Sequence, residues 1–224
     1  MTISLSDAGK RFNREWIFRH FTYDFEPDQS YAITGPNGSG KSTLLQVLSG
    51  SLMVNQGRIQ YLQRGLLTTV KTGEGPAASI TYQPHILPAE QVYRHVSICA
   101  PYLEVVEEMT LTEFLDFHRV FKPCLPGVTV QDIIAQTGLE KAANKQIRYY
   151  SSGMKQRVKL AQCIFSDTDI VLLDEPCTNL DTDGIALYHR LISDFCQKRL
   201  VIVSSNDKVE YEFCKKKLSI LDWK

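Results

Sequence analysis

Hydrophobic residues recur with two different periods along the chain, and together they predict an α/β fold. Residues 21–25 alternate apolar and polar side chains, which is typical of a half-buried antiparallel strand, and residues 2–12 predict a strand or hairpin arm before it. Residues 170–173 and 200–203 are apolar throughout, as expected of strands that are buried on both faces of a parallel sheet. We therefore expect a mostly parallel core sheet with an N-terminal antiparallel β subdomain.

Helical spacing governs a second group of segments. Thr110 and Glu113 fit a capping box, and apolar residues then recur at helical intervals. Residues 130–137, closed by Gly138, and the segment after Ser151 predict further helices in the same region. We expect a single domain, residues 1–224, in which a helical subdomain at about 103–159 is inserted into a core at about 1–102 and 160–224.

Other segments complete the predicted sheets. Residues 58–63 and 96–100 have strand character, and a last strand is expected at 217–221. Residues 64–92 contain many glycines and prolines, which indicates either extra strands or a long loop inserted between two core strands.

Composition and charge limit the classes of function that fit this chain. Lys and Arg number 25, as do Asp and Glu, so no overall field attracts nucleic acid, and no nucleic-acid partner is expected. The six cysteines have neither a C-x-x-C pair nor a histidine spacing suited to zinc, and we expect them to be reduced packing residues. No apolar leader follows Met1, and no apolar run approaches the roughly 18 residues that span a bilayer, so we expect a soluble chain.

One stretch joins a predicted strand, a glycine-rich turn and a predicted helix. Residues 35–42, G-P-N-G-S-G-K-S, follow strand residues 30–34 and fit the phosphate-binding pattern G-x-x-x-x-G-K-[ST] at every fixed position. In such a loop the backbone N–H groups and the helix N-terminus bind phosphate, Lys41 reaches the β- and γ-phosphates, and the Ser42 hydroxyl binds Mg²⁺. The predicted nucleotide-binding residues are Gly35, Pro36, Asn37, Gly38, Ser39, Gly40, Lys41, Ser42 and Thr43.

An acidic pair follows the buried strand at residues 170–173. Open α/β sheets bind ligands at the carboxyl ends of their strands, which is where Asp174 and Glu175 are placed. We expect Asp174 to hold Mg²⁺ through water and Glu175 to act as the general base that polarises the attacking water.

Residues 150–157, Y-S-S-G-M-K-Q-R, resemble the signature of the ATP-binding cassette (ABC) transporter family, which is roughly L-S-G-G-Q followed by Q-R. Ser151 and Gly153 match the signature serine and second glycine, whereas Ser152 and Met154 replace the first glycine and the glutamine. Ser151 precedes Asp174 by 23 positions, which fits the family's order and spacing. The chain is therefore similar to the nucleotide-binding subunits of this family, with their P-loop NTPase fold, over nearly its whole length.

The resemblance implies that the chain binds ATP and Mg²⁺ as cofactors and that it is the ATP-hydrolysing subunit of a membrane transporter. It implies a head-to-tail dimer, with a second copy or another ABC subunit, in which the phosphate loop of one subunit and Ser151 and Gly153 of the other enclose each ATP. It also implies a separate transmembrane permease chain, which would hold this chain at the cytoplasmic face of the membrane. Phe12 lies 29 positions before Lys41, where the family has an aromatic residue that stacks on adenine.

The chain departs from the family pattern where a glutamine normally senses Mg²⁺ and the membrane partner. Aligning the family pattern on residues 109–111 puts Tyr102 at that position. Tyrosine does not replace glutamine directly, and Glu104 and Gln83 are the alternatives. This departure leaves the sensor of Mg²⁺ open among the three residues.

A second departure concerns the family's switch histidine, whose position before Asp207 is taken by Asn206. A carboxamide donates a hydrogen bond to the γ-phosphate but does not titrate. We expect Asn206 to take this catalytic role as a neutral donor. His118 and His189 are placed on predicted helices and are expected to be structural residues rather than replacements.

Two other functions are considered beside the transporter subunit, and the departures favour only the first of them. The first is a degenerate ABC subunit that binds ATP as a structural or regulatory switch with little hydrolysis, although the retained Lys41, Asp174 and Glu175 oppose it. The second is a soluble ABC-type ATPase outside transport; such a protein would normally have a second cassette, a long coiled coil or a basic arm, and this sequence indicates none of the three.

Overall fold

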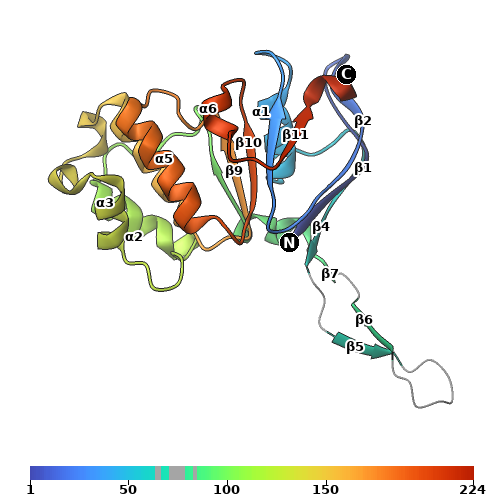
Figure 1. Ribbon diagram of the computed structural model, residues 1–224, viewed down its shortest axis with the longest axis horizontal. Coiled ribbons are helices and arrows are strands. Elements are labelled where there is room, and N and C mark those ends of the chain that lie inside the picture. Colours follow the sequence, from blue (N-terminus) through green and yellow to red (C-terminus); the bar gives the residue numbers. More distant parts are fainter. Residues whose placement is uncertain (64–66, 71–78, 83–84) are drawn as a thin grey trace.

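Two main β-sheets, a separate two-stranded sheet and a lobe of helices make up the described part of the computed structural model of the chain (Figure 1). The structure describes residues 1–63, 67–70, 79–82 and 85–224. Gln83, one alternative for the family glutamine, lies outside the described residues. In Figure 1 the antiparallel sheet lies on one side of the parallel sheet, and helices α2 (Leu111–Phe121) and α3 (Val130–Thr137) lie on the other.

The parallel sheet has five strands in the order β11-β3-β10-β9-β8. The strands are β3 (Ser30–Thr34), β8 (Val96–Cys99), β9 (Ile170–Asp174), β10 (Leu200–Ser204) and β11 (Lys216–Ser219). Every residue of β9 and β10 is buried, because their alternate side chains enter two different hydrophobic cores. Val171 and Leu173 pack among the helices, whereas Ile170 and Leu172 pack toward the antiparallel sheet. This two-sided burial explains the uninterrupted apolar runs.

The register of the parallel strands brings the phosphate loop and the acidic pair to one edge of the sheet. Ser204 at the end of β10 pairs with Ile33 of β3 on one side and with Asp174 of β9 on the other. The chain therefore leaves β3 for the phosphate loop only one strand away from Asp174.

The antiparallel sheet has the strand order β2-β1-β4-β7. Its strands are β1 (Thr2–Phe12), β2 (Glu15–Phe25), β4 (Gln56–Gln63) and β7 (His85–Ile86). A separate pair, β5 (Leu67–Val70) and β6 (Ser79–Tyr82), projects from the rest of the chain in Figure 1. Between the alternatives of strands and a long loop for residues 64–92, the described part of this segment contains strands and the 3₁₀ helix η1 (Ala89–Arg94).

The remaining helices begin and end largely where capping residues predict. They are α1 (Lys41–Leu48), α4 (Ser152–Ile164), α5 (Thr182–Phe195) and α6 (Lys208–Tyr211), with the short 3₁₀ helices η2 (Glu140–Ala142) and η3 (Ile147–Tyr149). The capping box of Thr110 and Glu113 is present at the start of α2, and Gly138 ends α3 with a left-handed φ of +68°. Within the described residues, every helix is too short or too polar to cross a bilayer.

The prediction for the C-terminal strand is wrong beyond Ser219. β11 ends there, and η4 (Ile220–Trp223) follows as a 3₁₀ helix whose first turn is capped by the Ser219 hydroxyl, which accepts from the Leu221 N–H at 3.3 Å. The turn lets Trp223 stack on Phe21 with ring centroids 4.1 Å apart. The predicted fold class, with a parallel core sheet, an antiparallel β subdomain and an inserted helical subdomain, is confirmed.

Candidate functional site

The phosphate loop forms the turn between β3 and α1. Its tightest point is Gly40, where φ is +96° and a Cβ would clash with the Ile17 side chain, so only glycine fits. α1 begins at Lys41 without a side-chain cap, which leaves backbone N–H groups of its first turn free for a ligand. The loop and helix N-terminus are thus arranged as a cradle for anionic oxygens.

Lys41 is held inside this loop with its side chain nearly buried. Its ammonium donates to the carbonyl oxygens of Gly35 at 2.9 Å and of Pro36 at 3.2 Å. Lysine has three N–H donors, so one is left to reach toward a phosphate. A hollow of about 230 Å³ opens beside it, lined by Ile17, Asn37, Gly38, Gly40, Lys41, Ser42, Thr43 and Glu175.

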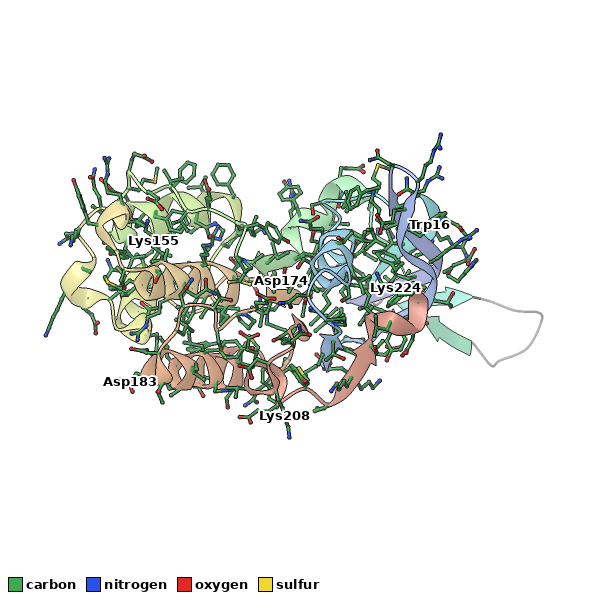
Figure 2. All side chains as sticks on the ribbon, turned by 90° about the horizontal axis from the view of Figure 1, so that it is seen from above. Trp16, Lys155, Asp174, Asp183, Lys208 and Lys224 are labelled. Atoms are coloured by element: carbon green, nitrogen blue, oxygen red, sulfur yellow. The ribbon has the colours of Figure 1, made fainter. Side chains whose placement is uncertain are left out.

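Three buried oxygen atoms near this edge of the sheet lack a hydrogen-bond partner among the described residues. They are Ser39 Oγ, Asp174 Oδ1 and Ser204 Oγ. Buried polar atoms in native proteins are nearly always paired, so unpaired ones beside a phosphate loop fit a polar ligand. Figure 2 shows Asp174 near the middle of the molecule, between the helical lobe that carries Lys155 and the sheet that carries Trp16. The carboxylate of Asp174 and the hydroxyl of Ser42 are oxygen donors of the kind that Mg²⁺ takes.

Glu175 has a strained backbone at the point where β9 ends. Its φ is +43°, which is unusual for a residue with a side chain, and its N–H donates to Ser204 O at 2.9 Å. The side chain lines the same hollow as Lys41 and Ser42. The structure therefore brings the predicted base, the predicted phosphate-binding lysine and one predicted Mg²⁺ ligand together.

Asn206 also reaches the phosphate loop, in a contact that sequence reasoning did not foresee. Its Nδ2 donates to Asn37 Oδ1 at 2.7 Å, although the two residues are 169 positions apart. Asn206 follows β10, and Asp207 then caps α6 by accepting from the Val209 N–H at 3.0 Å. The predicted switch position thus lies at the edge of the predicted phosphate site.

The signature residues lie on a different surface of the chain. Ser151 caps α4 by accepting from the Met154 N–H at 3.2 Å. A Cβ on Gly153 would lie 2.9 Å from Asn179 O, so glycine is required there by the close approach of the following loop. Residues 151–154 and 179–181 line a hollow of about 580 Å³ that shares no residue with the phosphate-loop hollow.

Phe12 is not brought into the phosphate-loop hollow. Its side chain is 47% exposed, and the Lys10 ammonium lies 5.2 Å from the ring centroid. Ile17 of β2 lines the hollow instead, and no motif in the sequence marks it. The adenine-stacking role of Phe12 stays a prediction that this geometry does not support.

Tyr102 and Glu104 face different surroundings. Burial raises the pKa of Tyr102; a hydrogen bond with Gln46 of α1 lowers it, and the Asp174 charge raises it further. The contact with Gln46 places the Tyr102 hydroxyl beside α1. Glu104 instead lines a separate hollow of about 140 Å³ with Lys122 and Lys159. Which residue takes the place of the family glutamine stays a prediction.

The two helical histidines have structural contacts. His118 pairs with Ser166 Oγ at 2.9 Å and Gln162 Nε2 at 3.2 Å, and burial lowers its pKa to about 4. His189 Nε2 lies 3.8 Å from a carboxylate oxygen of Glu212. The expectation that they are structural residues fits these contacts.

Comparisons with known proteins agree on one family. The sequence model of the ABC transporter family matches residues 18–178, a range that contains the phosphate loop, the acidic pair and the signature residues. The uncharacterized ABC transporter ATP-binding protein YybJ of Bacillus subtilis is 28% identical over 213 residues, which cover 92% of this chain and 86% of that protein. The cytochrome c biogenesis ATP-binding export protein CcmA of Agrobacterium fabrum is 25% identical over 208 residues, which cover 92% of this chain and 88% of that protein.

One similar solved structure is described as the dimeric structure of a bacterial ABC transporter cassette. It has a TM-score of 0.73 at 17% identity and covers 97% of this chain and 94% of that one. At this identity the likeness shows a shared fold.

Proposed function

The chain belongs to the ABC transporter family, and we propose that it is the ATP-binding and ATP-hydrolysing subunit of a membrane transporter whose transmembrane part is a separate chain. The observation that supports hydrolysis best is the hollow shared by Lys41, Ser42 and Glu175, beside the unpaired carboxylate oxygen of Asp174. A site that only stored nucleotide would not need a carboxylate base at this place.

Each residue has a role in the proposed reaction. The loop N–H groups and Lys41 would bind the β- and γ-phosphates, while Ser42 would hold Mg²⁺ directly and Asp174 would hold it through water. Bound Mg²⁺ would supply charge neutralisation at the phosphates. Glu175 accepts the proton of the attacking water, and Asn206 donates a hydrogen bond to the charge that develops on the γ-phosphoryl group.

The proposed site needs a second subunit to enclose the nucleotide. The phosphate-loop hollow of about 230 Å³ is smaller than the roughly 300 to 1,000 Å³ typical of sites that bury a ligand. The separate signature hollow offers a serine hydroxyl at the start of α4, where the positive end of the helix dipole favours a phosphate. We propose that a second copy, or another ABC subunit, docks its signature onto this phosphate loop, head to tail.

The proposed docking site for the transmembrane chain is the surface of residues 102–109, which would place the protein at the cytoplasmic face of a membrane. Tyr102 is 44% and Val106 is 40% exposed there, whereas Val105 is buried in the core and serves packing instead. Residues 102–109 come directly after the Ala100 and Pro101 segment that follows β8, so a partner bound there would contact the chain close to the carboxyl edge of the parallel sheet.

We predict that Val106→Asp weakens binding to the proposed transmembrane partner chain by about tenfold or more, since a desolvated charge replaces an apolar contact. The measurement is a pull-down of the co-expressed pair from detergent. Val209→Asp on α6 is a matched control, because Val209 is also 40% exposed. Equal recovery with Val106→Asp and Val209→Asp would reject residues 102–109 as the docking site.

We predict that Asn206→Ala lowers the turnover of ATP with little change in its affinity. Losing one donor to a developing oxyanion typically costs about 10² to 10³ in rate, and a carboxamide supplies such a donor. Asn206→His should hold or raise the rate and introduce a titration near the histidine pKa of about 6.5, which the wild type lacks at this position. Steady-state phosphate release against pH tests all three proteins. Equal rates for wild type and Asn206→Ala would show that Asn206 is not the switch position, and would favour either the binding-only alternative or a different donor.

A further inference from the structure

Two buried polar side chains hold the loop that follows Glu175. Glu210 of α6 accepts from the Cys177 N–H at 2.7 Å, and Gln156 of α4 donates to Pro176 O at 2.7 Å. Glu210 is 5% and Gln156 is 3% exposed. The segment of residues 176–179, here called the base loop, is thus held from two sides by elements that are distant in sequence.

Glu210 is an unusual residue at this place because it is an acid in the protein interior. Burial raises the pKa of its carboxyl, and hydrogen bonds with Ser205 and Cys177 oppose the rise. Among the described residues, no Lys, Arg or His nitrogen lies within ion-pair distance of Glu210. Burying an acid is unfavourable unless hydrogen bonds compensate for the lost solvation. The hydrogen bond that Glu210 accepts from the Cys177 N–H therefore needs an explanation.

The base loop connects the predicted base to the signature. Glu175 O accepts from the Thr178 N–H at 3.1 Å, so the left-handed conformation of Glu175 is fixed by the loop that Glu210 holds. At the other end of the loop, the carbonyl oxygen of Asn179 lies so close to Gly153 that a Cβ there would be only 2.9 Å away. A shift of the base loop would therefore move both Glu175 and its contact with the signature residue.

The same helix connects the base loop to the predicted switch position. α6 begins directly after Asn206 and Asp207, and the Glu210 N–H donates to Asp207 O at 3.1 Å. Tyr188 of α5 donates to Glu210 O at 2.8 Å, which fixes the helix against its neighbour. Glu210 thus lies one turn from Asn206 and is bonded to the loop after Glu175.

We propose that Glu210 is a positioning residue that sets the place of Glu175 through its hydrogen bond to the Cys177 N–H, with Gln156 holding the opposite side of the base loop. The effect on hydrolysis rests on the function proposed above, whereas the effect on the base loop does not. Glu210 does not touch the reacting atoms, and its carboxamide analogue keeps an oxygen that accepts from the same N–H.

The experiment compares Glu210→Ala, Glu210→Gln and the control Glu212→Ala. Glu212 is a matched control because it is an exposed glutamate two positions along the chain. Hydrogen exchange of residues 177–180 measures the base loop, nucleotide titration measures ATP affinity, and phosphate release with varied ATP separates kcat from KM. Thermal unfolding of each variant shows whether it is folded.

We expect Glu210→Ala to speed amide exchange in residues 177–180 by about tenfold or more, because the Cys177 N–H loses its side-chain acceptor. We also expect kcat to fall by about 10- to 100-fold with KM and ATP affinity nearly unchanged, since a small misplacement of a catalytic group costs up to about 10² in rate. Glu210→Gln should restore most of both losses, and Glu212→Ala should match the wild type.

Several results would overturn the proposal. Unchanged exchange in Glu210→Ala would show that the Cys177 contact does not hold the base loop. If kcat fell no further in Glu210→Ala than in Glu212→Ala, Glu210 would have no specific effect on hydrolysis. If Glu210→Ala lost ATP affinity and folding together with kcat, Glu210 would be a structural residue. A Glu210→Gln variant no better than Glu210→Ala would reject the hydrogen bond as the cause. If the wild type itself released no phosphate, the proposed hydrolysis would fail, and the exchange experiment would still decide the role of Glu210.

Discussion

Replacing Glu175 with Gln is expected to slow phosphate release by two or more orders of magnitude while ATP binding is retained. The carboxamide has nearly the same shape as the carboxylate, so the hollow beside Lys41 and Ser42 keeps its form. It does not accept a proton from the attacking water, and general-base catalysis is typically worth about 10² to 10⁴ in rate. Glutamate and glutamine are both L-residues with a Cβ, so the substitution does not relieve the strained φ of residue 175.

This variant also tests the proposed dimer. If hydrolysis opens the dimer, Glu175→Gln should accumulate an ATP-bound dimer, which light scattering with Mg-ATP detects. Glu26→Gln is the control, because it makes the same change on an exposed turn before β3. Scattering that shows only monomer would contradict the head-to-tail arrangement for the isolated subunit. A turnover equal to that of the wild type would mean that Glu175 is not the base.

Replacing Lys41 with Ala should remove most ATP binding. The ammonium is buried within the loop and is the only lysine or arginine that lines the phosphate-loop hollow among the described residues. A hydrogen bond to a charged group contributes about 1.5 to 3 kcal/mol, so losing the contact to the β- and γ-phosphates predicts an affinity at least about tenfold weaker. The substitution also leaves the Gly35 and Pro36 carbonyl oxygens without this donor.

Titration with a fluorescent ATP analogue measures this affinity. Lys198→Ala is the control, because it removes an exposed lysine that lies outside the hollow. Circular dichroism confirms that both variants are folded. A wild-type affinity in Lys41→Ala would show that residues 35–42 do not bind the triphosphate as proposed.

The features that could be predicted from the sequence are those set by nearby residues. The helix starts at Thr110 and Ser151 depend on side chains that cap the N–H groups of the same turn, and the end at Gly138 depends on a left-handed backbone. The cradle at residues 35–42 is likewise formed within one short segment. These signals do not require knowledge of the rest of the fold.

The contacts that could not be predicted join segments that are distant in the chain. Asn37 meets Asn206 only because β3 and β10 are neighbours in the sheet. Ile17 lies between Phe18, which pairs with Lys10, and Trp16, which pairs with Arg11, at a register shift of the β1–β2 pair. Such a shift changes which side chains face one surface. Periodicity alone does not reveal such shifts.

The close approach of Asn179 to Gly153 has a consequence for recognising related chains. The position of Gly153 is limited by a neighbouring carbonyl oxygen, whereas the first glycine of the family pattern is replaced here by Ser152 without loss of the helix start. A search pattern that demands both glycines and the glutamine would reject this chain. A pattern of serine, any residue and glycine, 23 positions before the acidic residue that ends a buried strand, would accept it.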